Sequence, residues 1–322
     1  MKGEMTMNKH VKQKIAIIGT GAIGVSLAAL FTGNGYDTTM LALTDKLADK
    51  AKESWLELYR VLQERGLVTA EQTSVCEKYL HITLDYDDLV DAQLIFECAF
   101  EDKDVKYSIY EQIEKHCRCF DVIVSTTSAM SPETLNAGLK TCPEKLVVAH
   151  PFLPPHLVPF VELVRAAITS DEAVQTAYDM LESCGRKVCV MKKSAPGFIA
   201  NRLQHALVRE AYYMIDRGLA DPRDIDKALM YSFMPRYTSV GLLEHQDAFG
   251  LDKVQNVENY LLPDLCDAKE ALPFVCSHVE KGELGQVTGK GTYEWDEASI
   301  ADFKARAAEP YWKYFNWDMP QQ

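Results

Sequence analysis

At 322 residues the chain is long enough for two domains of about 150 residues each. Its 34 Lys and Arg residues stand against 47 Asp and Glu, and a net charge of −13 excludes nucleic acid and anionic membrane surfaces as partners. Nine scattered cysteines form no C-x-x-C pair, so we expect no metal site and reduced thiols, which indicate a cytoplasmic protein.

The first half of the chain alternates short apolar runs with amphipathic stretches. The apolar runs are rich in β-branched residues and predict buried strands at 14–19, 38–43, 94–98, 122–125, 146–149, 160–164 and 187–191. The stretches between them predict helices at 21–32, 45–65, 104–116 and 171–184. This alternation predicts an α/β fold, a Rossmann-type doubly wound and mostly parallel sheet over residues 1–192.

The pattern changes after Met191. A long helical stretch ends at Arg217-Gly218, and Asp221-Pro222 is typical of a helix start. The next expected strand is only at 292–295, so we predict an all-helical substrate and dimerisation domain over 193–322. Its apolar stripes favour a homodimer, and the aromatic segment 311–317 is expected to dock on the partner subunit.

A glycine motif follows the first apolar run. Gly19-Thr-Gly21-Ala22-Ile23-Gly24 fits G-x-G-x-x-G between a strand and a helix, the position in which such a loop binds the pyrophosphate of a dinucleotide. The first glycine allows the tight turn, the second lets the backbone approach the ligand, and the third lets the helix pack on the strand. A glycine-rich turn without a ligand is the alternative.

The acidic residue that should bind the adenosine ribose is missing. Ala42 stands at its position, and Asp45 could substitute for it, or Thr44 and Lys46 could receive a 2′-phosphate. NAD and NADP both stay open, and NAD is favoured because no arginine is nearby.

A histidine and a glutamate stand out in two later strands. His150 ends an apolar strand at the edge where such sheets bind ligands, and Glu162 lies inside another apolar run. A carboxylate on one imidazole nitrogen would fix the tautomer and make His150 a general base. A purely structural His–Glu pair is the alternative.

With these residues in place, the chain resembles the 3-hydroxyacyl-CoA dehydrogenase family over nearly its whole length. Five segments carry the resemblance in order: 19–24, 95–106, Ser125-Thr-Thr-Ser128, 195–202 and 288–293. The sequence His150-Pro-Phe-Leu-Pro-Pro155 and the run 159–164 are similar to the branch of lambda-crystallin, L-gulonate 3-dehydrogenase and L-carnitine dehydrogenase, as is Pro235-Arg236-Tyr237.

The resemblance implies a role for each matching residue. His150 would be the base and Glu162 its orienting carboxylate, and Ser128 and Asn201 would bind the reacting oxygen. Gly19, Gly21, Ala22, Ile23, Gly24, Glu101 and Lys106 would contact the cofactor. Leu153 departs from the family, which usually has asparagine there.

Together with these residues, the resemblance implies an NAD(P)-dependent oxidoreductase that interconverts a small 3-hydroxy acid and its 3-oxo acid by hydride transfer. Arg236 is the candidate for the substrate carboxylate, because a guanidinium fork suits that group, and a surface arginine is the alternative. Two other functions stay open: a 3-hydroxyacyl-CoA dehydrogenase, and a non-catalytic dinucleotide-binding or crystallin-like structural protein.

Overall fold

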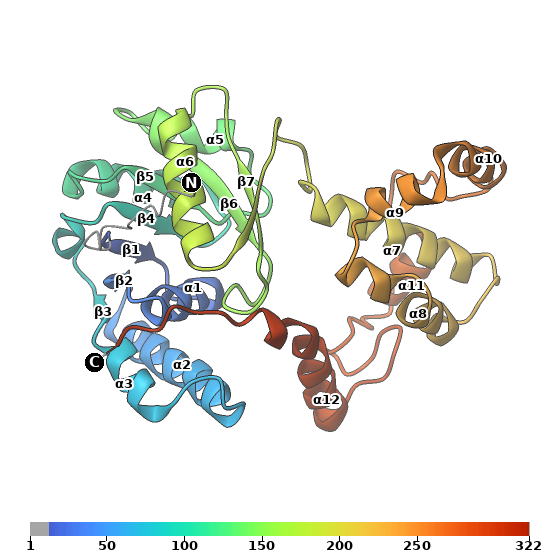
Figure 1. Ribbon diagram of the computed structural model, residues 1–322, viewed down its shortest axis with the longest axis horizontal. Coiled ribbons are helices and arrows are strands. Elements are labelled where there is room, and N and C mark those ends of the chain that lie inside the picture. The colour runs from blue at the N-terminus through green and yellow to red at the C-terminus, as the bar shows by residue number, and fades with distance from the viewer. Residues whose placement is uncertain (1–12, 322) are drawn as a thin grey trace, which may run out of the picture. The chain divides into compact units, whose positions relative to one another are not determined.

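The computed structural model describes residues 13–321, which divide into two compact units (Figure 1). The first unit runs to Phe198 and includes the chain from Ala308 onward, and the second is Ile199–Ala307. The sequence interpretation placed every residue from 193 onward in one second domain. In the structure the final segment returns to the first unit, because its aromatic side chains pack there.

An eight-stranded sheet forms the centre of the first unit, in the order β3-β2-β1-β4-β5-β6-β7-β8. Neighbouring strands are parallel except β6 and β7, so the sheet is mostly parallel, as predicted. The strands are β1 (Ile15–Ile18), β2 (Thr38–Leu41), β3 (Leu80–Thr83), β4 (Leu94–Glu97), β5 (Val122–Ser125), β6 (Leu146–Pro151), β7 (Phe160–Val164) and β8 (Lys187–Val190).

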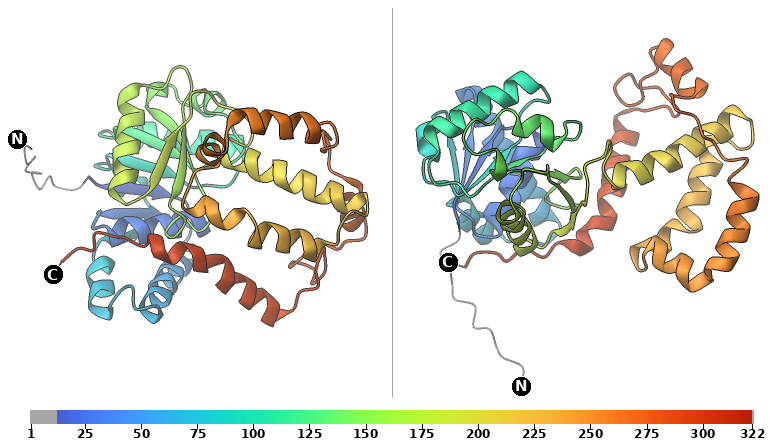
Figure 2. Two further views of the ribbon diagram at one scale, coloured as in Figure 1. Left: turned by 45° about the vertical axis from the view of Figure 1, so that its right-hand side comes forward. Right: turned by 90° about the horizontal axis from the view of Figure 1, so that it is seen from above.

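Helices cover both faces of this sheet (Figure 2). On one face lie α1 (Ala22–Gly33) and α6 (Asp171–Ser183), with α2 (Asp45–Glu64) packed on α1. On the other lie α4 (Lys103–His116) and α5 (Pro132–Asn136). A hydrophobic core fills each interface, since the central strands are buried on both sides.

Capping residues set the helix limits. Thr44 caps α2 by accepting the N–H of Leu47, and the helix ends before Gly66, whose φ is +67°. The helix α3 (Ala70–Glu77) and the edge strand β3 were not predicted from the sequence. Short 3₁₀ turns occur at Tyr86–Leu89 and Pro143–Lys145.

The second unit is helical, as the sequence predicts. Its helices are α7 (Ala200–Asp216), α8 (Pro222–Tyr231), α9 (Leu242–Phe249), α10 (Leu251–Leu261), α11 (Pro273–Glu280) and α12 (Glu297–Ala308), with a 3₁₀ turn at Met234–Thr238. The strand expected at 292–295 is wrong, because Lys290 makes only isolated bridges to Gly285 and Glu294 there.

The terminal segment packs against the first unit of its own chain, whereas the sequence suggested docking on a partner subunit. It opens with a 3₁₀ turn at Glu309–Tyr314 and continues to Trp317, which is 7% exposed. A Cβ at Gly33 would lie 2.1 Å from the Trp317 ring, so the glycine makes room for the indole. The N–H of Asp318 donates to the Asn34 side chain at 2.9 Å, which fixes the segment at the end of α1.

Candidate active site

The glycine loop joins β1 to α1, and packing explains two of its three glycines. Gly19 has φ +118°, and a Cβ there would lie 2.5 Å from the carbonyl oxygen of Cys98. A Cβ at Gly24 would lie 2.2 Å from the oxygen of Gly19. Gly21 is different, because nothing lies within 4 Å of its Cβ position and it precedes the first turn of α1. That open approach to a helix N-terminus fits a pyrophosphate.

A cavity of about 870 Å³ opens beside this loop and suits the adenosine half of a dinucleotide. It is lined by Gly19, Gly21 and mostly apolar side chains, among them Leu41, Leu43 and Val105. At the end of β2, Ala42 is buried and Leu43 is 86% exposed. The hydroxyl of Thr44 is engaged in capping α2, and Asp45 stands in the first turn of that helix, so a ribose contact by Asp45 stays a prediction.

The predicted base and its carboxylate meet across two neighbouring strands. The antiparallel register of β6 and β7 pairs His150 with Glu162, and Nδ1 of the imidazole lies 2.8 Å from Oε2 of the carboxylate. The side chains are 8% and 0% exposed, respectively. An ionised Glu162 accepts the Nδ1 proton, which leaves Nε2 as the proton acceptor of the ring.

Two aromatic rings enclose this imidazole. The ring centroids of Phe152 and Phe198 each lie 5.3 Å from that of His150. Phe198 has φ +47°, a left-handed conformation that is uncommon outside glycine, and this places its ring on the histidine. Leu153, at the family's usual asparagine position, is 62% exposed.

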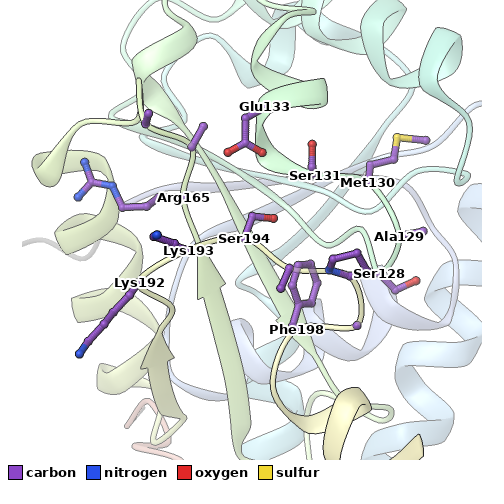
Figure 3. Close-up of a pocket in the computed structure, with 15 residues that line it drawn as sticks. Ser128, Ala129, Met130, Ser131, Glu133, Arg165, Lys192, Lys193, Ser194 and Phe198 are labelled. Carbon is purple, nitrogen blue, oxygen red and sulfur yellow. The ribbon is translucent and has the colours of Figure 1, made fainter. Parts of the chain in front are cut away.

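The serine motif after β5 offers one available hydroxyl. Ser125 donates to Glu97 at 2.6 Å, Thr126 donates to the Glu97 carbonyl, and Thr127 donates to Glu101. Ser128 is exposed and lines a cavity of about 860 Å³, which Phe198 also lines. In the view of Figure 3 these two residues stand at one end of the cavity, and Arg165, Lys192 and Lys193 stand at the other.

A buried polar cluster that the sequence interpretation missed lies under this motif. Glu97 accepts hydrogen bonds from Lys106 at 2.7 Å, Ser125 at 2.6 Å, Tyr110 at 3.2 Å and the N–H of Ala99 at 2.8 Å. Burial raises the pKa of Tyr110 well above its usual value, so the phenol stays a donor. A glutamate inside the apolar run 94–98 was the available signal, as with Glu162.

This cluster bears on two predicted cofactor contacts. The Lys106 side chain is 1% exposed, and its ammonium lies 2.7 Å from Glu97 and 3.7 Å from Glu101. Glu101 is itself partly exposed and accepts from Thr127. The contacts of Glu101 and Lys106 with the cofactor stay predictions, and the structure assigns Lys106 a buried partner.

The other two predicted substrate residues belong to the second unit. Asn201 lies in the first turn of α7 and is half-buried. Arg236 is exposed in the 3₁₀ turn Met234–Thr238, and its Nη1 donates to Nε2 of His245 at 2.8 Å. Within that unit Arg236 therefore has an imidazole partner.

Two other kinds of site are absent from the part of the chain that the structure describes. None of the helices in residues 13–321 is long and apolar enough to cross a membrane. In the same residues no three His, Cys, Asp or Glu side chains are grouped so that they could hold a metal ion.

A doubly wound sheet whose strand ends carry a dinucleotide loop and a carboxylate-bound histidine defines a nicotinamide-dependent dehydrogenase. Sequence comparison narrows this class. Residues 14–194 match the NAD binding domain of 3-hydroxyacyl-CoA dehydrogenase, and residues 197–295 match its C-terminal domain. The chain belongs to the 3-hydroxyacyl-CoA dehydrogenase family.

Several relatives align over most of the chain. It is 28% identical over 282 residues to 5-formyl-3-hydroxy-2-methylpyridine 4-carboxylate 5-dehydrogenase of Mesorhizobium japonicum, covering 87% of this chain and 90% of that protein. L-carnitine dehydrogenase of Oceanobacillus iheyensis is 33% identical over 234 residues, 71% and 73% of the two chains. 3-Hydroxybutyryl-CoA dehydrogenase of Clostridioides difficile is 26% identical over 285 residues, 88% and 100%.

Structure comparison agrees with these relatives. The crystal structure of the 5-formyl-3-hydroxy-2-methylpyridine 4-carboxylic acid 5-dehydrogenase, described as an NAD⁺-dependent dismutase, superimposes with a TM-score of 0.83 at 26% identity. The match covers 93% of this chain and 96% of that one. The chain is thus a dehydrogenase that uses NAD and acts on a 3-hydroxy group.

Proposed function

We propose that the physiological substrate is a small, free 3-hydroxy acid, carnitine-like or gulonate-like, which is interconverted with its 3-oxo acid. The observation that carries the chemistry is the buried contact of 2.8 Å between His150 and Glu162. Two relatives support a carboxylate-bearing substrate, since their names specify L-carnitine and a pyridine carboxylate.

The residues of this chain divide the work of the reaction. Glu162 holds Nδ1 of His150, so Nε2 accepts the proton of the substrate hydroxyl and Glu162 stabilises the imidazolium that forms. Bound NAD supplies the hydride acceptor. Ser128 and Asn201 hydrogen-bond the reacting oxygen and stabilise its developing charge.

Arg236 binds the substrate carboxylate in this proposal. Its guanidinium is directed to a neutral acceptor, Nε2 of His245, and no carboxylate of the described residues forms an ion pair with it. A substrate carboxylate would give it a charge-assisted bidentate partner. The chain as a whole carries net charge −13, and Arg165, Lys192 and Lys193 are further cations, at the end of the Ser128 cavity away from Ser128.

A homodimer through the second unit belongs to the same proposal. Of the hydrophobic side chains in residues 199–307, only Ile225 and Cys266 are buried. Many large ones are exposed, including Tyr231, Leu243, Leu251, Tyr260 and Val287. A surface this apolar is typical of an interface. Light scattering at micromolar concentration is expected to give the dimer mass, and a monomer would contradict it. A cytoplasmic location is proposed from the cysteine pattern alone.

The test is a substrate panel measured with NAD and with NADP: L-carnitine, L-gulonate, 3-hydroxybutyrate and 3-hydroxybutyryl-CoA. We expect one of the free acids to give the highest kcat/KM. A preference for 3-hydroxybutyryl-CoA would instead favour the acyl-CoA function of the Clostridioides difficile relative. Binding of NADH without turnover of any substrate would indicate a non-catalytic protein.

A variant tests the base directly. His150→Gln keeps a polar side chain but removes the proton acceptor, so kcat should fall by at least about 10²-fold while NADH affinity is retained. Unchanged turnover in this variant would remove His150 from the mechanism.

A further inference from the structure

The loop that joins the two catalytic strands is tied to the cofactor helix by a buried hydrogen-bonded pair. Residues 152–159 connect β6, which carries His150, to β7, which carries Glu162. In this loop His156 is 4% exposed and meets Ser26 of α1, which is 2% exposed. The Ser26 hydroxyl oxygen lies 2.7 Å from Nδ1 of His156 and accepts the His156 backbone N–H at 2.9 Å.

The protonation state of His156 sets the direction of the hydrogen bond between its ring and Ser26. Burial, with a smaller effect of Arg186, lowers the pKa of His156 to about 4, so the ring is neutral at ordinary pH. The hydroxyl of Ser26, which accepts the backbone N–H, then donates its own hydrogen to Nδ1. The hydroxyl of Ser26 and Nδ1 of His156 therefore satisfy each other.

A second buried side chain ties the same loop to the start of β8. Arg186 is 1% exposed and donates to the carbonyl oxygens of Pro155 at 3.0 Å and Val158 at 3.4 Å. Its Nε donates to the carbonyl of Cys184 at 3.2 Å. Burying a cation against neutral carbonyl groups costs free energy. Arg186 is nevertheless buried where it holds the loop between His150 and Glu162.

The composition of the loop explains the need for such ties. Four of the residues from Pro151 to Pro159 are proline and lack a backbone N–H. The backbone hydrogen bonds inside the loop are those from Leu157 and Val158 to the Pro154 carbonyl. Side chains from outside therefore take over the role of backbone pairing.

We propose that Ser26 and His156 are positioning residues, which with Arg186 hold the β6–β7 loop, and with it His150, at a fixed place relative to the cofactor helix. The idea rests on the proposed role of His150 as base. Hydride transfer needs the base and the nicotinamide to be aligned together, and a displacement of about 1 Å can cost about 10²-fold in rate. The contact between α1 and the loop links the position of His150 to that of the helix that begins at the glycine loop.

The variants Ser26→Ala and His156→Gln test this, with Thr32→Val as the matched control. Thr32 is a fully buried hydroxyl on the same helix, but it donates to Ala28 and accepts from Trp55, away from the loop. All three variants should lose thermal stability. Only the first two should lower kcat, by about 10-fold or more, with KM and the Kd for NADH unchanged.

Two further readouts separate positioning from stability. With the panel acid that wild type oxidises fastest, deuterated at its carbinol carbon, the isotope effect on kcat should rise in Ser26→Ala because hydride transfer becomes rate-limiting. Without any substrate, NADH should slow amide hydrogen exchange in residues 152–158 of wild type and Thr32→Val, and this protection should be lost in Ser26→Ala and His156→Gln.

The outcomes are distinct. Equal losses of kcat in Ser26→Ala and Thr32→Val, or NADH protection of the loop that survives in Ser26→Ala, would overturn the positioning role. Failure of wild type to oxidise any panel substrate would overturn the proposed function, and the exchange experiment with NADH would still decide whether the helix and the loop are coupled.

Discussion

The buried pair of Lys106 and Glu97 permits a sharp prediction about stability. The two side chains are 1% and 0% exposed, and Nζ lies 2.7 Å from Oε1. Lys106→Met preserves most of the side-chain volume but leaves the Glu97 carboxylate with only the N–H of Ala99 and the hydroxyls of Ser125 and Tyr110. Removing one partner of such a buried pair costs about 3–5 kcal/mol, because the remaining charge is uncompensated.

The expected change in melting temperature follows from this loss of free energy and from the size of the first unit. For a domain of about 200 residues, 1 kcal/mol corresponds to about 2–4 °C. We therefore expect the unliganded Lys106→Met variant to melt roughly 6–20 °C below wild type, by circular dichroism or scanning fluorimetry. In the double variant Glu97→Gln/Lys106→Met, neither charge is left unpaired, so its loss should be smaller than the sum of the two single losses.

The same experiment separates this role from the cofactor contact implied by the family resemblance. A lysine that touches the cofactor would leave the melting temperature of the unliganded protein unchanged and would raise the Kd for NADH. If Lys106→Met melts like wild type but binds NADH weakly, the structural reasoning is refuted and the cofactor contact stands.

Three further changes have expected outcomes. Between pH 6.5 and 4 the unfolded chain binds a proton at His156 that the folded chain does not. The stability that neutral His156 contributes is therefore present above pH 6.5 and is lost on acidification. Measured by urea unfolding, the free energy of unfolding of wild type should fall by roughly 2 kcal/mol more from pH 7 to 5 than that of His156→Gln. Trp317→Ala should destabilise by about 3 kcal/mol, and Gly33→Ala should also destabilise, because its Cβ would displace the indole; wild-type melting curves for both would mean the segment does not pack there. Arg236→Met should lower kcat/KM for the acid about 30-fold or more while the Kd for NADH is unchanged; equal kcat/KM would leave Arg236 a surface residue.

Much of the first unit could be predicted because its strands are buried on both faces. A run such as Ile15–Ile18 is continuously apolar for this reason, and glycines mark where it ends. The edge strand Leu80–Thr83 was missed because three of its four residues are at least partly exposed and the apolar signal is weak. The pair of His150 and Glu162 was predictable, since two polar residues interrupt apolar strands.

Contacts between distant parts of the chain could not be predicted in the same way. Ser26 and His156 are 130 positions apart, and nothing in either local sequence specifies the other. Similarly, seven consecutive residues rich in aromatic rings, 311–317, indicated burial but not the surface that is covered. Patterns along the chain report how much of a side chain is buried, whereas its partner depends on the topology of the sheet.

The helix α1 makes several contacts of this kind, each with a different distant part of the chain. From Gly24 to Gly33 every residue is buried. Polar side chains in this stretch therefore need hydrogen-bond partners within the protein, and the glycines lie where a neighbouring segment approaches closely. Gly24 leaves room for the glycine loop, Ser26 holds the loop that follows His150, and Gly33 leaves room for the ring of Trp317. A substitution at each of these positions therefore disturbs a different part of the molecule. All of them lower stability, so a stability measurement alone does not separate their roles, and Ser26 needs a kinetic measurement.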